Sequence, residues 1–162
     1  MIEEIYKWLD EKYPEGAIWT SSEFGCYRDA PVEIRMILSM HQLESEVANG
    51  GLPQFLWNTY YHWRKVLEDC KTGCEFIGAF EQKNAVAEFW YLCEQHEAEC
   101  FKFIQSCIRD NDFSYFGKWC EHSAAALKSG RESLFWTDSG LEEKRIGWLN
   151  ENRERELSLM VN

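Results

Sequence analysis

The sequence predicts an all-α protein: a single-domain multi-helix bundle over residues 1–162, with an αα-hairpin at an Asn-Gly-Gly corner. Apolar residues recur at alternating steps of three and four, the period of an amphipathic helix, and no segment alternates with the period of two typical of a half-buried strand. The chain is 45% hydrophobic and 15% aromatic, which suffices for one buried core at a length of 162 residues. The elements are therefore expected to be helices joined by short connections.

The first half of the chain predicts three helices. Ile2 to Tyr13 has an apolar stripe at helical spacing, and residues 14–30, with several Gly, Pro and Ser, predict an irregular connection. Pro31 marks the start of a second helix that runs to Asn49-Gly50-Gly51, because Asn and Gly adopt the left-handed backbone that ends helices. The same apolar alternation resumes at Pro53 and continues to Cys70, which predicts a third helix after a tight corner.

The second half predicts three more helices. Thr72-Gly73 ends the preceding one, a short apolar segment follows over Cys74 to Phe80, and a long buried helix comes next. Six of its residues step by 4, 3, 4, 3 and 4 and share one stripe: Phe89, Cys93, His96, Cys100, Phe103 and Cys107.

Asp110-Asn111-Asp112 ends this long helix. A further helix carries Phe116 and runs to the stop at Gly130. Ser139 and Glu142 fit a reciprocal capping box, which predicts a last helix from Leu141.

The charge balance limits the partners of the chain. It has 28 acidic and 17 basic side chains and a formal net charge of −11, which repels nucleic acid and anionic membranes and favours a basic protein partner. No apolar run approaches the roughly 18 residues of a membrane span, and MIEEIYKWLDEKY lacks the features of a secretory signal. We expect a cytoplasmic protein with its seven cysteines reduced.

Catalytic signatures are absent from the sequence. It contains no phosphate-binding, dinucleotide-binding, acyl-transfer or zinc-protease motif, so we expect a protein that is not an enzyme and has no cofactor. Cys93, His96 and Cys100 have a spacing that could offer a metal three ligands. Because Phe89 and Phe103 share their stripe, we interpret them as packed core without metal.

Glutamates concentrate between residues 81 and 100, a segment that contains five of them and only one lysine. At 100° per residue, Glu94 lies opposite the Phe89/Cys100 stripe, Glu97 flanks one side of it and Glu88 flanks the other. An acidic binding surface must therefore draw carboxylates from several helices. Glu88, Glu94 and Glu97 are its candidate partner-binding residues.

The corner carries a specific motif, a glutamate followed by Asn-Gly-Gly, an apolar residue, one position, Gln, two bulky apolar residues and a later Asn. It is matched here by Glu46, Asn49, Gly50, Gly51, Leu52, Gln54, Phe55, Leu56 and Asn58. This pattern resembles the family of small acidic helical bacterial proteins named after a DNA-mimic protein and otherwise catalogued as a domain of unknown function. The resemblance covers about residues 30–152.

The resemblance implies an all-helical fold and competition with DNA for a basic DNA-binding protein such as a transcriptional repressor. One alternative is an immunity-type inhibitor of a nuclease toxin, which would also present carboxylates to a basic groove. A further alternative is an uncharacterised enzyme with a cleft near Asn49–Asn58. The sequence does not exclude a homodimer. We interpret the motif as mainly structural, with Gln54 and Asn58 bonding backbone carbonyls left open at the corner.

Overall fold

The computed structural model of the protein describes residues 7, 11, 30–136, 139–152 and 155. These residues form helices and no strand, which confirms the all-α fold class. The helices are α3 (Val32–Asn58), α4 (Trp63–Phe76), α5 (Phe80–Asp110), α6 (Ser114–Ser123), the 3-10 helix η1 (Glu132–Phe135) and α7 (Leu141–Glu151). In this part of the chain no helix is long and apolar enough to cross a bilayer.

The predicted helix Ile2–Tyr13 and the predicted connection 14–30 lie almost entirely outside the described residues. Of the former, Lys7 and Glu11 are described, and both are helical. Their Nζ and Oε1 atoms are 3.9 Å apart, as expected for residues one turn apart on one helix face.

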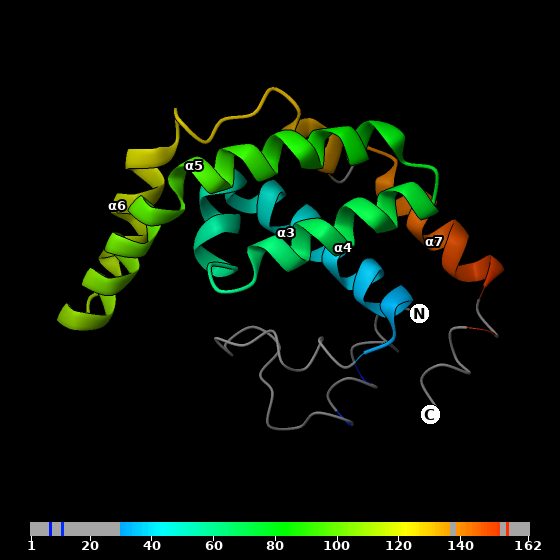
Figure 1. The fold of residues 1–162 in the computed structure, drawn as a ribbon, viewed down its shortest axis with the longest axis horizontal. Helices are drawn as coiled ribbons and strands as arrows, with labels where there is room; N and C mark the ends of the chain where they lie inside the picture. Colours follow the sequence, from blue (N-terminus) through cyan, green and yellow to red (C-terminus); the bar gives the residue numbers. More distant parts are fainter. Residues whose placement is uncertain (1–6, 8–10, 12–29, 137–138, 153–154, 156–162) are drawn as a thin grey trace.

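The helices pack side by side in alternating directions (Figure 1). α3 and α4 contact each other and run in opposite directions, and α5 returns alongside α4 over the length of the molecule. α6 folds back against the C-terminal end of α5, and the chain then crosses to η1 and α7 near the other end. η1 contacts both α3 and α5.

One apolar core joins these helices. Its largest fully buried side chains include Phe55 of α3, Trp63 of α4, Phe89 of α5 and Trp119 of α6. The predicted α5 stripe faces this core at Phe89, Cys93 and Cys100, whereas His96, Phe103 and Cys107 are half-buried. The stripe thus identifies the buried face of α5 near the helix centre.

The corner lies within α3. Gly51 has φ 71° and ψ −167°, a non-helical conformation that kinks α3 at this residue. The part after the kink ends at Asn58, where the Thr59 hydroxyl donates to the Phe55 carbonyl at 2.6 Å. The prediction of one helix from Pro53 to Cys70 is therefore wrong: the chain reverses in two steps, at Gly51 and at the turn of residues 59–62.

Gly73 does not end a helix. It lies buried inside α4, which continues to Phe76, and the break comes at Gly78 with φ 71°. A Cβ at position 73 would lie 3.0 Å from Met40 Cε and 3.1 Å from Met36 Cβ. Glycine is needed at this position because α3 and α4 approach closely there.

The ends of the last helices also differ from the prediction. α5 ends as predicted, with Asn111 in the left-handed region at φ 48°. α6 ends at Ser123, well before Gly130, and its last turn is closed by the Ser123 hydroxyl donating to the Trp119 carbonyl at 2.7 Å. α7 begins at Leu141 as predicted, but its N-cap is Gly140 and no side chain makes the reciprocal bonds of a capping box.

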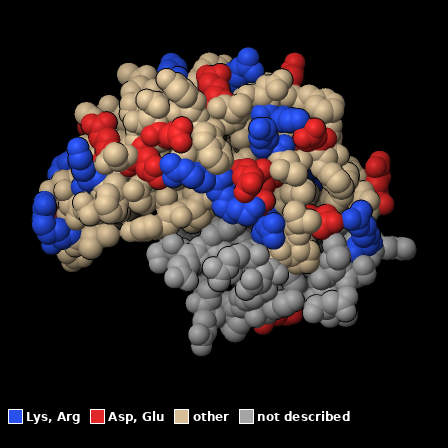
Figure 2. All heavy atoms as spheres, in the orientation of Figure 1, with Lys and Arg blue, Asp and Glu red and all other residues tan. Residues whose placement is uncertain are grey.

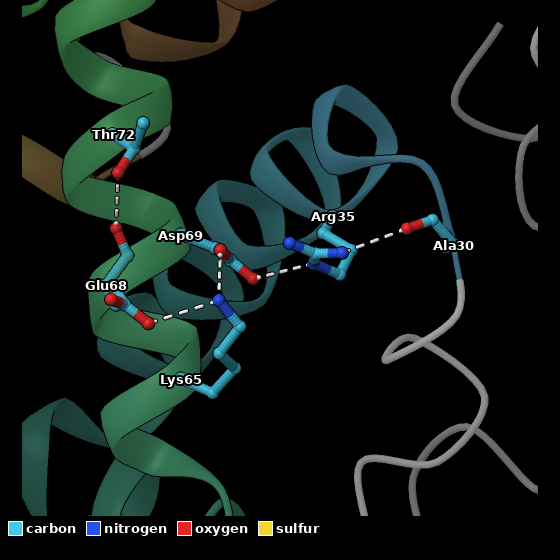
Figure 3. Close-up of polar contacts among 6 residues, drawn as sticks. All are labelled: Ala30, Arg35, Lys65, Glu68, Asp69 and Thr72. Carbon is cyan, nitrogen blue, oxygen red and sulfur yellow. Dashed lines mark hydrogen bonds and ion pairs between the residues drawn. The ribbon is translucent and has the colours of Figure 1, made fainter.

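A polar network ties α3 to α4 (Figure 3). Asp69, buried on α4, accepts from Arg35 Nε at 3.2 Å and from Lys65 Nζ at 2.8 Å. Arg35 also donates to the Ala30 carbonyl at 3.0 Å, where the chain enters α3, and Lys65 also contacts Glu68. Two cations thus compensate one buried carboxylate.

Candidate functional site

The three candidate partner-binding glutamates lie on α5 and face different neighbours. Glu97 points toward α4, Glu88 bonds to the segment that precedes η1, and Glu94 is exposed. The structure therefore does not bring their carboxylates together on one small patch. The positions of the three glutamates around the helix, at 100° per residue, predict this separation.

Glu97 is held by two residues of α4. Arg64 donates to both of its carboxylate oxygens, at 2.5 and 2.7 Å, and the buried indole of Trp63 donates to Oε1 at 3.1 Å. The hydrogen bonds from Arg64 lower the pKa of Glu97, and those to Glu97 raise the pKa of Arg64. The Arg64 guanidinium also lies 4.2 Å from the centre of the Trp63 ring, in a cation–π contact.

Glu88 is also bonded within the chain. The Ser129 hydroxyl donates to its Oε1 at 2.6 Å, and Arg131 Nε lies 3.4 Å from its Oε2. These contacts tie α5 to the segment that leads into η1. Glu94 is exposed and acts at longer range, because its charge contributes to the raised pKa of Arg64.

Charges of both signs share the visible face of the molecule (Figure 2). Asp and Glu side chains alternate there with Lys and Arg and do not form a single acidic field. Ion pairs among the described residues include Lys83 with Glu75, Arg109 with Asp110, and Lys118 with Asp112. Nine of the 28 acidic side chains, against three of the 17 basic ones, lie outside the described residues.

The Asn-Gly-Gly motif builds a polar clasp across the kink of α3. Gln54 Nε2 and Asn58 Nδ2 both donate to Oε2 of the buried Glu46 carboxylate, each at 2.8 Å. The prediction that Gln54 and Asn58 bond open corner carbonyls is therefore wrong. The kink directs both amides back toward the helix turn that precedes it, where Glu46 offers a stronger acceptor than a carbonyl.

The remaining motif residues fit the geometry of the kink in α3. A Cβ on Gly50 would lie 2.5 Å from Gln54 Oε1, and Gly51 has the left-handed φ of 71°. Phe55 is fully buried, whereas Asn49 is exposed. Trp119 of α6 donates to the Pro53 carbonyl at 2.9 Å, so the kinked segment is fixed from a second side.

Cys93, His96 and Cys100 lie on successive turns of α5 but in different environments. Burial raises the pKa of the Cys93 and Cys100 thiols well above their ordinary value, which disfavours the thiolate that binds metals. His96 Nδ1 lies 3.8 Å from Glu99 Oε2. Within the described ranges, no three His, Cys, Asp or Glu side chains are grouped as metal ligands.

Sequence reasoning missed several polar pairs, among them Arg64 with Glu97 and Arg145 with Glu44. Arg64 and Glu97 are 33 positions apart, and Arg145 and Glu44 are 101 apart, so no local spacing reveals either pair. Arg145, on α7, donates to Glu44 on α3 at 2.6 Å, and both side chains are buried. A charged residue at an apolar position of α7 was the only available signal, because Arg145 lies one turn from Leu141 and Leu149.

These features define a class: helical proteins with an acidic excess and a carboxylate–amide clasp at a kinked Asn-Gly-Gly corner. A family model described as DMP19-like protein matches residues 28–152, so the chain belongs to the DMP19-like family. This confirms the resemblance seen in the motif, because the family is that of a DNA-mimic protein. No curated protein and no solved structure matches the chain.

Proposed function

We propose that this chain is a non-enzymatic binding protein that acts as a DNA mimic and sequesters a basic DNA-binding protein, such as a transcriptional repressor. The observation that carries the proposal is the match of residues 28–152 to the DMP19-like family, which implies binding to a DNA-binding protein in general. The net charge of −11 is consistent with it, because an acidic surface attracts the positive groove that otherwise holds phosphates.

The proposed contact residues on α5 are Glu88, Glu94 and Glu97, joined by carboxylates from other helices. Glu94 is the most available of the three because its side chain is exposed. Glu88 and Glu97 each accept hydrogen bonds within the chain, yet the Glu88 side chain is 41% exposed and the Glu97 side chain 27%. Each therefore still offers oxygen lone pairs to a partner.

The test is a pull-down from the source cell with the full-length protein at low ionic strength, followed by a salt gradient. The Debye length falls from about 10 Å at 0.1 M to about 3 Å at 1 M, so a partner held by exposed carboxylates should elute as salt rises. We expect a DNA-binding protein in that fraction, and DNA carrying its site should displace it. A nuclease would instead assign the immunity-type role, and a partner that salt does not release would contradict the acidic-surface mechanism.

Charge reversal locates the surface. Glu88→Lys, Glu94→Lys and Glu97→Lys together should weaken capture while the helical circular dichroism signal is retained. A matched triple reversal of exposed acids on α6 and α7, at Glu121, Glu143 and Glu151, changes the net charge equally. Equal weakening by both triples would contradict the α5 location and leave only a general charge effect.

A further inference from the structure

The α4/α5 face already binds one guanidinium, that of Arg64. This group stacks on Trp63 at 4.2 Å and forms the bidentate pair with Glu97, yet the Arg64 side chain is 45% exposed. Planar stacking and a two-point fork are the contacts by which proteins recognise arginine. The chain therefore contains an arginine-recognition site whose present occupant lies at the surface.

The surroundings of this site are suited to protein contact. Glu94 is exposed one turn before Glu97, so two carboxylates face the single Arg64 cation. Tyr61, in the turn before α4, is 56% exposed although it is a large aromatic side chain, and its ring contacts that of Tyr60. Tyr, Trp and Arg are the residue types that dominate the energetics of protein interfaces.

A groove continues the same face along α4 and α5. Its volume is about 420 Å³, and it is lined by Glu68, Lys71, Val86, Ala87 and Trp90. Trp90 packs edge-on against Trp63, with ring centres 5.2 Å apart, so the groove adjoins the arginine site. A bound segment could therefore extend beyond a single side chain.

We propose that this face binds an arginine-bearing segment of the partner protein, whose guanidinium replaces Arg64 on Glu97 and Trp63. The inference rests on the proposed function and names its contact surface. Exchange is feasible because the Arg64 side chain is 45% exposed, so it can turn into solvent while the incoming guanidinium forms the same contacts with Glu97 and Trp63. Charge complementarity favours an arginine occupant. Glu94 makes no two-point pair of the kind that Arg64 makes with Glu97, so its negative charge is available to attract a second guanidinium.

The test uses a nonaarginine peptide and follows the Trp63 indole N–H by NMR, because that group donates to Glu97 Oε1. The peptide should shift the Trp63 indole signal, and nonalysine at equal charge should bind several-fold more weakly because it lacks the planar fork. Arg64→Ala should tighten nonaarginine binding at least threefold by removing the competitor. Glu94→Gln should weaken it, whereas Glu143→Gln on α7 should not.

Arg109→Ala is the matched control for Arg64→Ala. Arg109 also forms a two-point pair, with Asp110 at the far end of α5, and its loss changes the net charge equally. Equal tightening by both variants, or an unchanged Trp63 signal, would overturn the proposed site. If a DNA-binding partner is captured and Arg64→Ala leaves its affinity unchanged, the site fails while the proposed function stands. If the peptide binds as expected and no DNA-binding protein is captured, the function fails while the site stands.

Discussion

Gly51 bends α3 because its backbone adopts φ 71°, a conformation that costs residues with a Cβ about 1 kcal/mol or more. We expect Gly51→Ala to lower the free energy of unfolding by about that amount in urea titrations. Gly50→Ala should also destabilise, because its Cβ would lie 2.9 Å from Gln54 Cβ, an atom that no side-chain rotation can move away. Gly117→Ala in α6, where nothing lies within 4 Å of the added Cβ, serves as the control and should not destabilise.

Glu46 serves two amide donors at once, so its removal leaves both without their acceptor. Glu46→Ala should cost about 1 to 3 kcal/mol of unfolding free energy, and Glu46→Gln less, because its carbonyl oxygen still accepts one bond. Thermal and urea unfolding of the two variants measures this. If Gln54→Ala and Asn58→Ala melt like the parent but no longer capture the partner, the motif is functional and our structural interpretation is wrong.

His62, in the turn before α4, gives a prediction for pH. Burial lowers the pKa of His62 from 6.5 to about 4. Between these two pH values His62 is therefore protonated in the unfolded chain and neutral in the folded chain. The stability from this residue is complete above pH 6.5 and is lost as the pH falls toward 4. His62→Gln should therefore reduce the difference in unfolding free energy between pH 7.5 and pH 4 by about 3 kcal/mol. Tyr61→Phe, at an exposed neighbour in the same turn, should leave the difference unchanged.

At the residue level, the glycine kink could be predicted from sequence but the Glu46 clasp could not. Asn49-Gly50-Gly51 is a local signal for left-handed backbone. The partner of Gln54 and Asn58 depends on the direction that the helix takes after Gly51, which no spacing specifies. The motif therefore locates the corner, and only the three-dimensional structure identifies its acceptor.

Among the helices, α7 is anchored to α3 by a buried ion pair. Arg145 is 1% exposed and donates to Glu44, whose pKa burial raises against the opposing effect of Arg145. Arg145→Met would leave the Glu44 carboxylate buried without its cation, which should cost about 3 to 5 kcal/mol. Adding Glu44→Gln to that variant should recover part of the loss. Full additivity of the two substitutions would contradict the pair, and urea unfolding followed by circular dichroism measures both.

The helices differ in how much of each could be predicted. α5 has a clear stripe and a local stop, so its centre and C-terminal end were predictable. Gly73 indicated a stop that does not exist, because its role is to let Met36 and Met40 of α3 approach α4. The sequence gives no local signal for the end of α6 at Ser123, which lies seven residues before the Gly130 that predicted the stop.

For the whole molecule, composition and periodicity were sufficient to predict the all-α class, and the Asn-Gly-Gly motif was sufficient to suggest the family by resemblance. The arrangement of charge could not be predicted in either way. Lysines and arginines far along the chain neutralise particular carboxylates, as Arg64 does Glu97. The net charge is the sum over all acidic and basic residues, and it does not say where oppositely charged side chains pair. The face of the molecule in Figure 2 is therefore less uniformly acidic than the total of −11 indicates.

The same charge balance predicts how salt acts on folding. At pH 7.5 the net charge near −11 makes the compact state repel itself, and screening by salt reduces that cost. Exposed ion pairs are screened as well, but each contributes only about 0 to 1 kcal/mol, so self-repulsion should dominate. We expect the melting temperature to rise between 0.01 and 0.5 M NaCl, as measured by circular dichroism. Near pH 5, close to the isoelectric point of 4.8, the net charge is small and salt screens mainly attractive pairs, so the rise should vanish or reverse. A melting temperature that falls with salt at both pH values would mean that the exposed ion pairs, such as Arg109 with Asp110, outweigh the repulsion.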